Sequence, residues 1–372
     1  MRDNPLKDRQ PRAEHPGRPG ALLRLPRAIA LAGAVLLAGC GNPAVSMWED
    51  YLQRIERLTE TELAPFEPFE VRRYPRRRAL AQPVPDLRTG MRRYFDLARC
   101  DMMGLVSERN SVLSRVQEDS LRLAYELRFL WLAEDCLAQD RLADKPEQEQ
   151  WLRQVTAQKQ EMLPDLYWNV TLAGDEIRGL FPLAGRASAS GSIPDGREVA
   201  RALEHLTALA GRLDSERLPQ DAATLEEDLK TLYRSDAGGQ LLHAMAVAED
   251  GLNRAAAMLE ETNLEALCPK GRATREARYL NNVFNEIYAG NVQPWLAALW
   301  RDMDRLAPAI IGLHGSQAVD NPVLEQWMAR HLSGESSLQT RTREAMERHT
   351  AAWQRLLDHC DMAPTAGTGR RN

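Results

Sequence analysis

The amino-acid sequence predicts an all-α protein, a multi-helix bundle of about ten helices. Val and Ile are scarce while Leu, Ala, Arg, Glu and Gln dominate, so few residues favour strands. Apolar residues recur at helical spacing, and no stretch shows a convincing alternation of apolar and polar residues. At 372 residues, the chain is long enough for one large or two moderate cores, and the sequence does not decide between them.

The first 39 residues have the pattern of a bacterial lipoprotein signal peptide. Arg24 and Arg27 precede an apolar run over residues 28–37 that is too short to span a bilayer. Leu37-Ala38-Gly39-Cys40 then matches the site at which the peptidase cuts before a lipid-modified cysteine. The alternative is a chance cysteine at the end of an ordinary signal peptide. We expect residues 1–39 to be removed and Cys40 to carry the lipid.

A lipid on Cys40 predicts where the protein is located. Each buried methylene contributes about 0.8 kcal/mol, so the acyl chains of a lipoprotein, palmitate among them, hold it at a membrane. Asp after the cysteine generally retains lipoproteins in the inner membrane, and this chain has Gly41 there. Beyond Cys40 no apolar run approaches the length of a transmembrane helix. We therefore expect a protein anchored in the outer membrane of a Gram-negative bacterium and facing the periplasm.

Net charge argues against nucleic acid as a partner. The first forty residues hold seven of the 48 Lys and Arg and three of the 53 Asp and Glu, which leaves 41 and 50 and a formal charge of −9. Such an acidic surface repels phosphate backbones. The membrane and an envelope protein are the partners that we expect.

Residues 40–64 should contain the lipidated N-terminus and the first helix. Apolar residues there recur at the spacing of an amphipathic helix: Trp48, Tyr51, Leu52, Ile55 and Leu58. Between Pro65 and Pro85 the prolines prevent a continuous helix, and the stretch contains Arg72-Arg73-Tyr74-Pro75-Arg76-Arg77-Arg78. These arginines could contact anionic lipid headgroups, at about 1 kcal/mol each. The interpretation that we favour is a solvated extended segment whose arginines pair with acidic residues of the body.

Residues 65–180 form the expected first helical half. Apolar stripes predict helices over residues 87–105 and 121–132, and further helices follow over 147–162 and 166–180. Gly, Ser, Ala and Pro then accumulate, so residues 181–195 are the expected linker.

Residues 196–360 form the expected second helical half, with Asp195 as N-cap of its first helix. Ser336 and Gln339 form a capping-box pair for the last helix, and 361–372 should be a disordered tail. The later helices are expected over 222–233, 239–262, 274–289, 292–306, 321–332 and 336–360.

Four cysteines remain after Cys40, namely Cys100, Cys136, Cys268 and Cys360. An exported protein usually pairs an even set, and three connectivities are possible. We favour Cys100 with Cys136 and Cys268 with Cys360, because each pair then falls within one half of the chain. Four free buried thiols are the alternative. The spacing of these cysteines is unlike that of a metal site.

The sequence shows no motif of catalysis or cofactor binding. It lacks the nucleophile elbow, the zinc-protease helix motif, the phosphate-binding loop and the dinucleotide fingerprint. The histidines after Cys40 are scattered, and none has a second His or Cys at helical spacing. We therefore expect no cofactor, metal site or catalytic residue, and the sequence favours a non-enzymatic protein.

Several short segments nevertheless make the chain resemble a known family. They are residues 51–54, 108–111, 125–130, 168–172, 291–296 and 353–360. Through them the chain resembles an uncharacterised family of proteobacterial lipoproteins, the domain-of-unknown-function family numbered three thousand and eighty. The resemblance implies an exported, helical, lipid-anchored protein and supplies no catalytic residues.

Polar residues of these segments form a candidate cluster. Most of them fall between or within strongly apolar helices, where Arg109 could form a fork with Glu126. A structural polar network is the interpretation that we favour, and a shallow ligand cleft is the alternative. The cluster comprises Arg109, Asn110, Ser111, Glu126, Arg128, Trp168 and Asn169.

Three classes of function remain open. The leading hypothesis is a non-enzymatic interaction or scaffold module of the cell envelope. The second is a binding module for a small envelope ligand, a lipid or a peptidoglycan fragment, which requires a pocket with convergent polar groups. The third is a hydrolase that uses two carboxylates about 5–10 Å apart.

Overall fold

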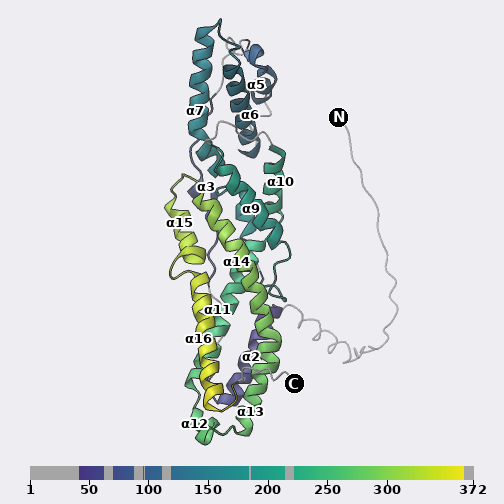
Figure 1. Cartoon of the computed structure of the whole chain (residues 1–372), viewed down its shortest axis with the longest axis vertical. Coiled ribbons are helices and arrows are strands. Elements are labelled where there is room, and N and C mark those ends of the chain that lie inside the picture. The colour runs from purple at the N-terminus through teal and green to yellow at the C-terminus, as the bar shows by residue number, and fades with distance from the viewer. Residues whose placement is uncertain are drawn as a thin grey trace, which may run out of the picture. The chain divides into compact units, whose positions relative to one another are not determined.

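The computed structural model describes residues 42–62, 70–87, 95, 97–110, 119–183, 186–213 and 222–363. The all-α prediction is confirmed, since the described residues form helices and no strand (Figure 1). The expected signal peptide with Cys40, and residues 364–372 of the expected tail, lie outside the described residues. No helix in the described part of the chain has the length and apolarity needed to cross a membrane.

The helices differ in length from short turns to long rods. The first ones are α2 (Pro43–Thr59), α3 (Arg77–Leu80), η2 (Leu97–Cys100), α5 (Met103–Asn110), α6 (Asp119–Ala138), α7 (Pro146–Val170), α8 (Asp175–Leu180), α9 (Gly196–Ala210) and α10 (Ala222–Tyr233). They are followed by α11 (Ala237–Glu261), α12 (Leu264–Leu267), η4 (Pro269–Gly271), α13 (Arg275–Asn282), η5 (Val283–Val292), α14 (Gln293–Gly315), α15 (Pro322–Met328), η6 (Ala329–Ser333) and α16 (Leu338–His359).

Helix α2 is amphipathic, as expected, and its apolar face is buried. Asn42 caps it by accepting a hydrogen bond from the amide of Ala44 at 3.1 Å. Trp48 is fully buried against α11 at Gly251, where an added Cβ would lie 2.4 Å from the indole ring. The glycine is therefore required for this close approach of the two helices.

The larger hydrophobic core combines helices from most of the chain. Within it α11 packs against α16 and α2, and α14 packs against α9. The expected linker, residues 181–195, contributes Phe181, Ala187 and Ile193 to this core. The amide of Ile193 also donates to the buried carboxylate of Asp302 at 2.7 Å. The division into two helical halves stays a prediction.

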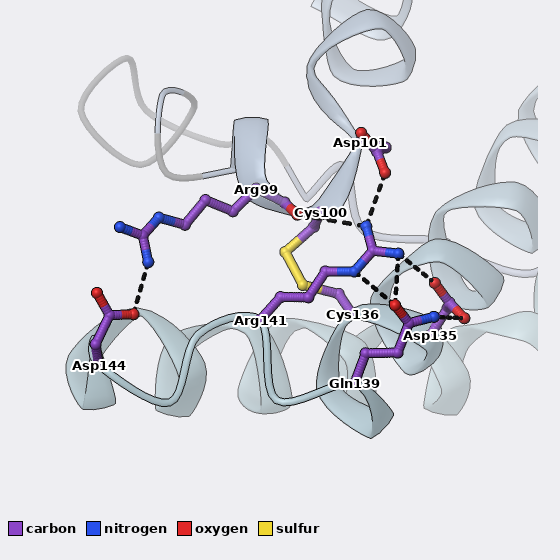
Figure 2. Close-up of a disulfide and its surroundings, with 8 residues drawn as sticks. All are labelled: Arg99, Cys100, Asp101, Asp135, Cys136, Gln139, Arg141 and Asp144. Atoms are coloured by element: carbon purple, nitrogen blue, oxygen red, sulfur yellow. Dashed lines mark hydrogen bonds and ion pairs between the residues drawn. A yellow bond between two sulfur atoms is a disulfide. The ribbon is translucent and has the colours of Figure 1, made fainter.

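A second, smaller core lies where α6, α7 and η2 meet, and a disulfide joins η2 to α6. Cys100 and Cys136 are bonded there, with their Cα atoms 5.1 Å apart. Around this bond Arg141 forms ion pairs with Asp101 at 2.7 Å and Asp135 at 3.2 Å (Figure 2). These exposed pairs contribute little individually, so burial and the covalent bond stabilise this region.

The other disulfide joins Cys268, just after α12, to Cys360 at the end of α16, with a Cα separation of 5.4 Å. Both pairings are the ones that the sequence analysis favours. Each bond restricts the unfolded chain over a long loop, of 36 and 92 residues respectively.

Two helix boundaries differ from prediction near proline. We expected separate helices over 147–162 and 166–180, but α7 continues through Pro164 because buried side chains on both sides of that residue outweigh one lost hydrogen bond. The chain turns only after Val170, at Gly174, where a Cβ would lie 2.4 Å from the Val170 carbonyl oxygen. The expected helices over 274–289 and 292–306 are likewise continuous, through the π-helix η5.

Two predicted caps are corrected. The N-cap of α16 is Ser337, whose hydroxyl accepts from the amide of Thr340 at 3.2 Å, so the pair of Ser336 and Gln339 was the wrong register. Asp195 does occupy the N-cap position of α9, but its side chain makes no capping hydrogen bond. The periodicity of apolar residues predicts that a helix is present, but it does not determine the residue at which the helix begins.

Candidate functional site

The arginine-rich segment, residues 70–87, is extended except for the single turn of α3, and distant side chains hold its backbone. At its start, the indole Nε1 of Trp327 donates to the carbonyl oxygen of Arg72 at 3.0 Å. The amide of Arg72 donates to Nε2 of His331 at 3.2 Å. The segment thus pairs with α15 and η6 rather than with a neighbouring strand.

His331 must be neutral to make this contact. Its Nδ1 lies 2.8 Å from the carbonyl oxygen of Trp327, which can only accept, so Nδ1 carries the proton and Nε2 accepts from Arg72. Burial above all, together with the charges of nearby arginines, lowers the pKa of His331 to about 4. The imidazole is therefore a fixed acceptor at neutral pH.

Tyr74 fixes the middle of the segment. Its ring is buried, stacked on Phe181 at 5.4 Å and edge-on to Trp327 at 4.9 Å between centroids. Its hydroxyl donates to the carbonyl oxygen of Leu172 at 2.8 Å, and burial raises the pKa of the phenol. A tyrosine among arginines thus anchors the arginines that flank it.

The end of the segment is held by α7 and by the cap of α15. Trp168 Nε1 donates to the carbonyl oxygen of Leu80 at 2.7 Å. The amide side chain of Asn169 both donates to and accepts from the backbone of Gln82, each at 2.8 Å. Asn321 Nδ2 donates to the carbonyl oxygen of Ala79 at 3.1 Å. Each contact satisfies a backbone group that has no helical partner.

A cleft of about 560 Å³ lies beside this segment, and we call it the arginine cleft. Its described lining residues are arginines together with apolar and aromatic residues, and no Asp or Glu is among them. We call Phe181, Pro182 and Leu183 its apolar side. The lining residues are Arg73, Tyr74, Arg76, Arg77, Arg78, Arg178, Phe181, Pro182 and Leu183.

Its arginines fall into two groups. Arg77 forms an ion pair with Asp119 and donates to the carbonyl oxygen of Asn169 at 3.2 Å, and Arg178 pairs with Asp175 at 2.8 Å. The exposed side chains of the second group make no hydrogen bond or ion pair within the described part of the chain. They are Arg73, Arg76 and Arg78. The interpretation that we favoured, in which the arginines pair with the body, therefore describes Arg77 only.

A second cleft, of about 940 Å³, adjoins the first at Arg77. Its charges are mixed: carboxylates such as Asp119 and Glu226 line it together with Lys230. Carboxylates beside the cations disfavour an anionic ligand there. Of the two clefts, the arginine cleft is the better candidate for a binding site.

The polar cluster expected from sequence does not form one cleft. Trp168 and Asn169 contact the backbone of Leu80 and Gln82 in the arginine-rich segment, and Arg109 pairs with Asp86, further along the same segment, at 3.1 Å. Arg128 is exposed. The side chain of Asn110, and Ser111, lie outside the described residues.

The fork between Glu126 and Arg109 that the sequence suggested is not formed. Glu126 forms its ion pair with Lys159. Both side chains are only 2% exposed, and the ammonium lies 4.6 Å from the ring centroid of Phe129. Burial lowers the pKa of Lys159, and the charge of Glu126 acts against that shift. The pair joins α6 to α7 and is structural.

Sequence reasoning missed a second buried histidine, His349. Trp353 Nε1 donates to the hydroxyl of Tyr51 at 2.7 Å, and that hydroxyl donates to Nε2 of His349 at 2.8 Å. Burial lowers the pKa of His349 to about 3. The three residues join α2 to α16, and no local pattern signals a contact between residues 298 positions apart.

The described residues contain no group of three or more His, Cys, Asp or Glu side chains placed to hold a metal ion. Among curated proteins and among solved structures, no match to the chain is found. One family model, described as "Protein of unknown function (DUF3080)", matches residues 48–364. That match spans both cores, the arginine cleft and both disulfides, and the chain belongs to this family.

Proposed function

We propose that this protein is a lipoprotein of the cell envelope, anchored through Cys40 to the inner leaflet of the outer membrane, whose helical body is a non-enzymatic interaction module. The leader and Leu37-Ala38-Gly39-Cys40 support the anchor. The two disulfides support an oxidising compartment such as the periplasm.

The observation that carries the interaction role is the way in which the arginine-rich segment is held. Buried side chains from α7, α15 and η6 fix its backbone, so the arginines of the cleft are presented from a rigid base. The positive charges of Arg73, Arg76 and Arg78 repel one another, so their proximity does not stabilise the fold. Such an arrangement supports binding of an anionic partner, since the backbone of the segment does not have to be ordered on association.

Two experiments test the two parts of this proposal. Metabolic labelling with palmitate should mark the native protein, and Cys40→Ser should abolish the label and release the protein from outer-membrane fractions. An unlabelled native protein would contradict the anchor.

For the interaction role, a photocrosslinking side chain replaces Leu183 in the cleft, with Arg301 on α14 as the control position. Crosslinking in intact envelopes should give one defined adduct at the cleft position only. Loss of that adduct in Arg73→Gln/Arg76→Gln/Arg78→Gln would assign it to the arginines. Equal crosslinking at both positions would contradict the proposal.

A further inference from the structure

We infer that the arginine cleft binds an organic phosphate monoester. This inference rests on the proposed binding role of the cleft and gives that role a ligand class. Three features of the cleft carry it, namely its free guanidinium groups, its apolar side and its rigid frame.

Three guanidinium groups of the cleft have no partner among the described residues, and their number favours phosphate over carboxylate. Guanidinium forks match the oxygens of either anion, but a carboxylate has two oxygens and one charge. A phosphate monoester has three terminal oxygens and a charge of about −1.5 to −2 near neutral pH. It can therefore pair with Arg73, Arg76 and Arg78 together, and one ligand then offsets the repulsion among them.

The two paired arginines of the cleft add no net positive charge and leave an anionic ligand to Arg73, Arg76 and Arg78. The charge of Arg77 is balanced by Asp119, which lines the neighbouring cleft, and that of Arg178 by Asp175. Because no carboxylate is among the described lining residues of the arginine cleft, an anion there meets no nearby repulsion from its walls.

The apolar side of the cleft indicates that the phosphate carries an organic group. Phe181, Pro182 and Leu183 face the same space as the arginines. A volume of about 560 Å³ exceeds what a phosphate group alone fills and falls within the range of small-molecule sites. The ester's carbon chain or sugar would cover this apolar side.

The frame around the cleft is rigid on both sides. Tyr74 stacks on Phe181, which couples the arginine-rich segment to the apolar side. A Cβ added to Gly238 would lie 2.4 Å from the Phe181 ring, and one added to Gly239 would lie 2.7 Å from Pro182. The start of α11 therefore supports the apolar side directly, and the backbone that carries the arginines is held before a ligand arrives.

Binding to the purified full-length protein tests the inference, in zwitterionic detergent for the soluble probes and after removal of the detergent for the vesicles. The probes are glycerol 3-phosphate, inorganic phosphate, phosphatidylcholine vesicles with and without phosphatidic acid, and a glutamate-rich peptide. We expect binding of glycerol 3-phosphate, of vesicles that contain phosphatidic acid, or of both, and a steep loss of affinity at high salt. Binding of glycerol 3-phosphate alone would identify a free metabolite as the source of the phosphate. Binding of the vesicles with phosphatidic acid alone would identify a lipid headgroup.

Three variants sharpen the test. Arg73→Gln/Arg76→Gln/Arg78→Gln should weaken binding by roughly a hundredfold. Arg128→Gln/Arg197→Gln/Arg301→Gln removes the same charge from exposed positions on α6, α9 and α14 and should leave binding unchanged. Arg73→Lys/Arg76→Lys/Arg78→Lys keeps the charge but loses the forks, and should bind about tenfold more weakly than the native protein.

Several results would overturn the inference. Binding of the peptide but of no phosphate ester would replace it with an acidic protein segment. Binding of inorganic phosphate alone would contradict the claim that the ligand carries an organic group. Equal binding by the native protein and the lysine variant would show that charge alone, without guanidinium forks, accounts for the affinity. A cleft crosslink that survives while every phosphate probe fails would separate this inference from the proposed function, which would then still stand.

Discussion

The backbone amide of Arg72 donates to the imidazole of His331 across 259 residues of sequence, at 3.2 Å. This bond requires the neutral imidazole, and burial keeps it neutral. The start of the arginine-rich segment therefore depends on the protonation state of one buried side chain. A second histidine, His349, is buried in the same neutral state between α2 and α16.

The first prediction concerns pH. Unfolded histidine takes up a proton near pH 6.5, whereas folded His331 and His349 resist protonation down to about pH 4 and about pH 3. The unfolded state thus binds more protons in this window, so the free energy of unfolding falls as pH falls through it. Each pKa unit is worth about 1.4 kcal/mol. Urea denaturation across pH measures the effect, and above pH 6.5 these two groups contribute no slope.

The variant His349→Gln should flatten part of this dependence, and Asn285→Ala on the exposed face of η5, which removes no titratable group, should not. The comparison of slopes isolates the histidine from the carboxylates that titrate at the acid end. A native slope retained in His349→Gln would contradict the assignment.

The second prediction concerns the frame of the arginine-rich segment. Asn169→Ala removes both hydrogen bonds to Gln82 and should free the end of the segment, whose arginines are trypsin sites. Under limited proteolysis we expect faster cleavage within residues 72–78, because cleavage follows local opening. Asn285→Ala on the exposed face of η5 is the control. Equal cleavage rates would show that other contacts suffice.

The third prediction concerns the buried ion pair. Glu126→Ala leaves the ammonium of Lys159 without its partner in a buried site and should cost about 3–5 kcal/mol of the free energy of unfolding. Glu126→Met/Lys159→Met should restore stability to near that of the native protein or above it. Chemical denaturation of the three proteins provides the measurement, and a double variant as unstable as the single one would refute the argument.

The fourth prediction concerns the contact between α2 and α11. Gly251→Ala places a methyl group against the indole of Trp48 and should cost about 1–3 kcal/mol. Gly104→Ala, where nothing lies within 4 Å of the added carbon, should be neutral or slightly stabilising. Thermal unfolding compares the two. A harmless Gly251→Ala would mean that the two helices are less closely packed.

The fifth prediction ranks the two disulfides. In the loop-entropy model, the 92-residue loop closed by Cys268 and Cys360 should contribute about 5 kcal/mol, and the 36-residue loop closed by Cys100 and Cys136 about 4 kcal/mol. Paired Cys→Ser variants, compared by denaturant unfolding, test the order. The reverse order would indicate that the longer loop is already restricted in the unfolded protein.

Local patterns predicted the helices because amphipathic spacing is a local property. Trp48 and Tyr51 of α2 are buried as their spacing indicated. The pattern failed at Pro164, where a proline suggested an end that tertiary packing overrode. It also failed at the start of α16, where adjacent serines offered two registers for one cap.

The arginine cleft could not be predicted from local sequence patterns. The cluster of arginines was evident in the sequence, but the residues that hold it, Trp327 and His331, lie more than 250 positions away. Trp168 and Asn169 were identified as polar residues with a structural role, yet their partners could not be found from spacing. Hydrogen bonds to an extended backbone leave no periodic trace in the sequence.

The pairing of the first described helix with the last one has a consequence for biogenesis. Tyr51 of α2 contacts His349 and Trp353 of α16, so the partners of Tyr51 are synthesised about 300 residues later. Until α16 has been synthesised, the apolar face of α2 lacks native packing partners there. Contacts between residues so far apart in sequence also form slowly. On the export route that we propose, we expect this chain to leave the inner membrane incompletely folded and to need protection from aggregation until its C-terminus has crossed.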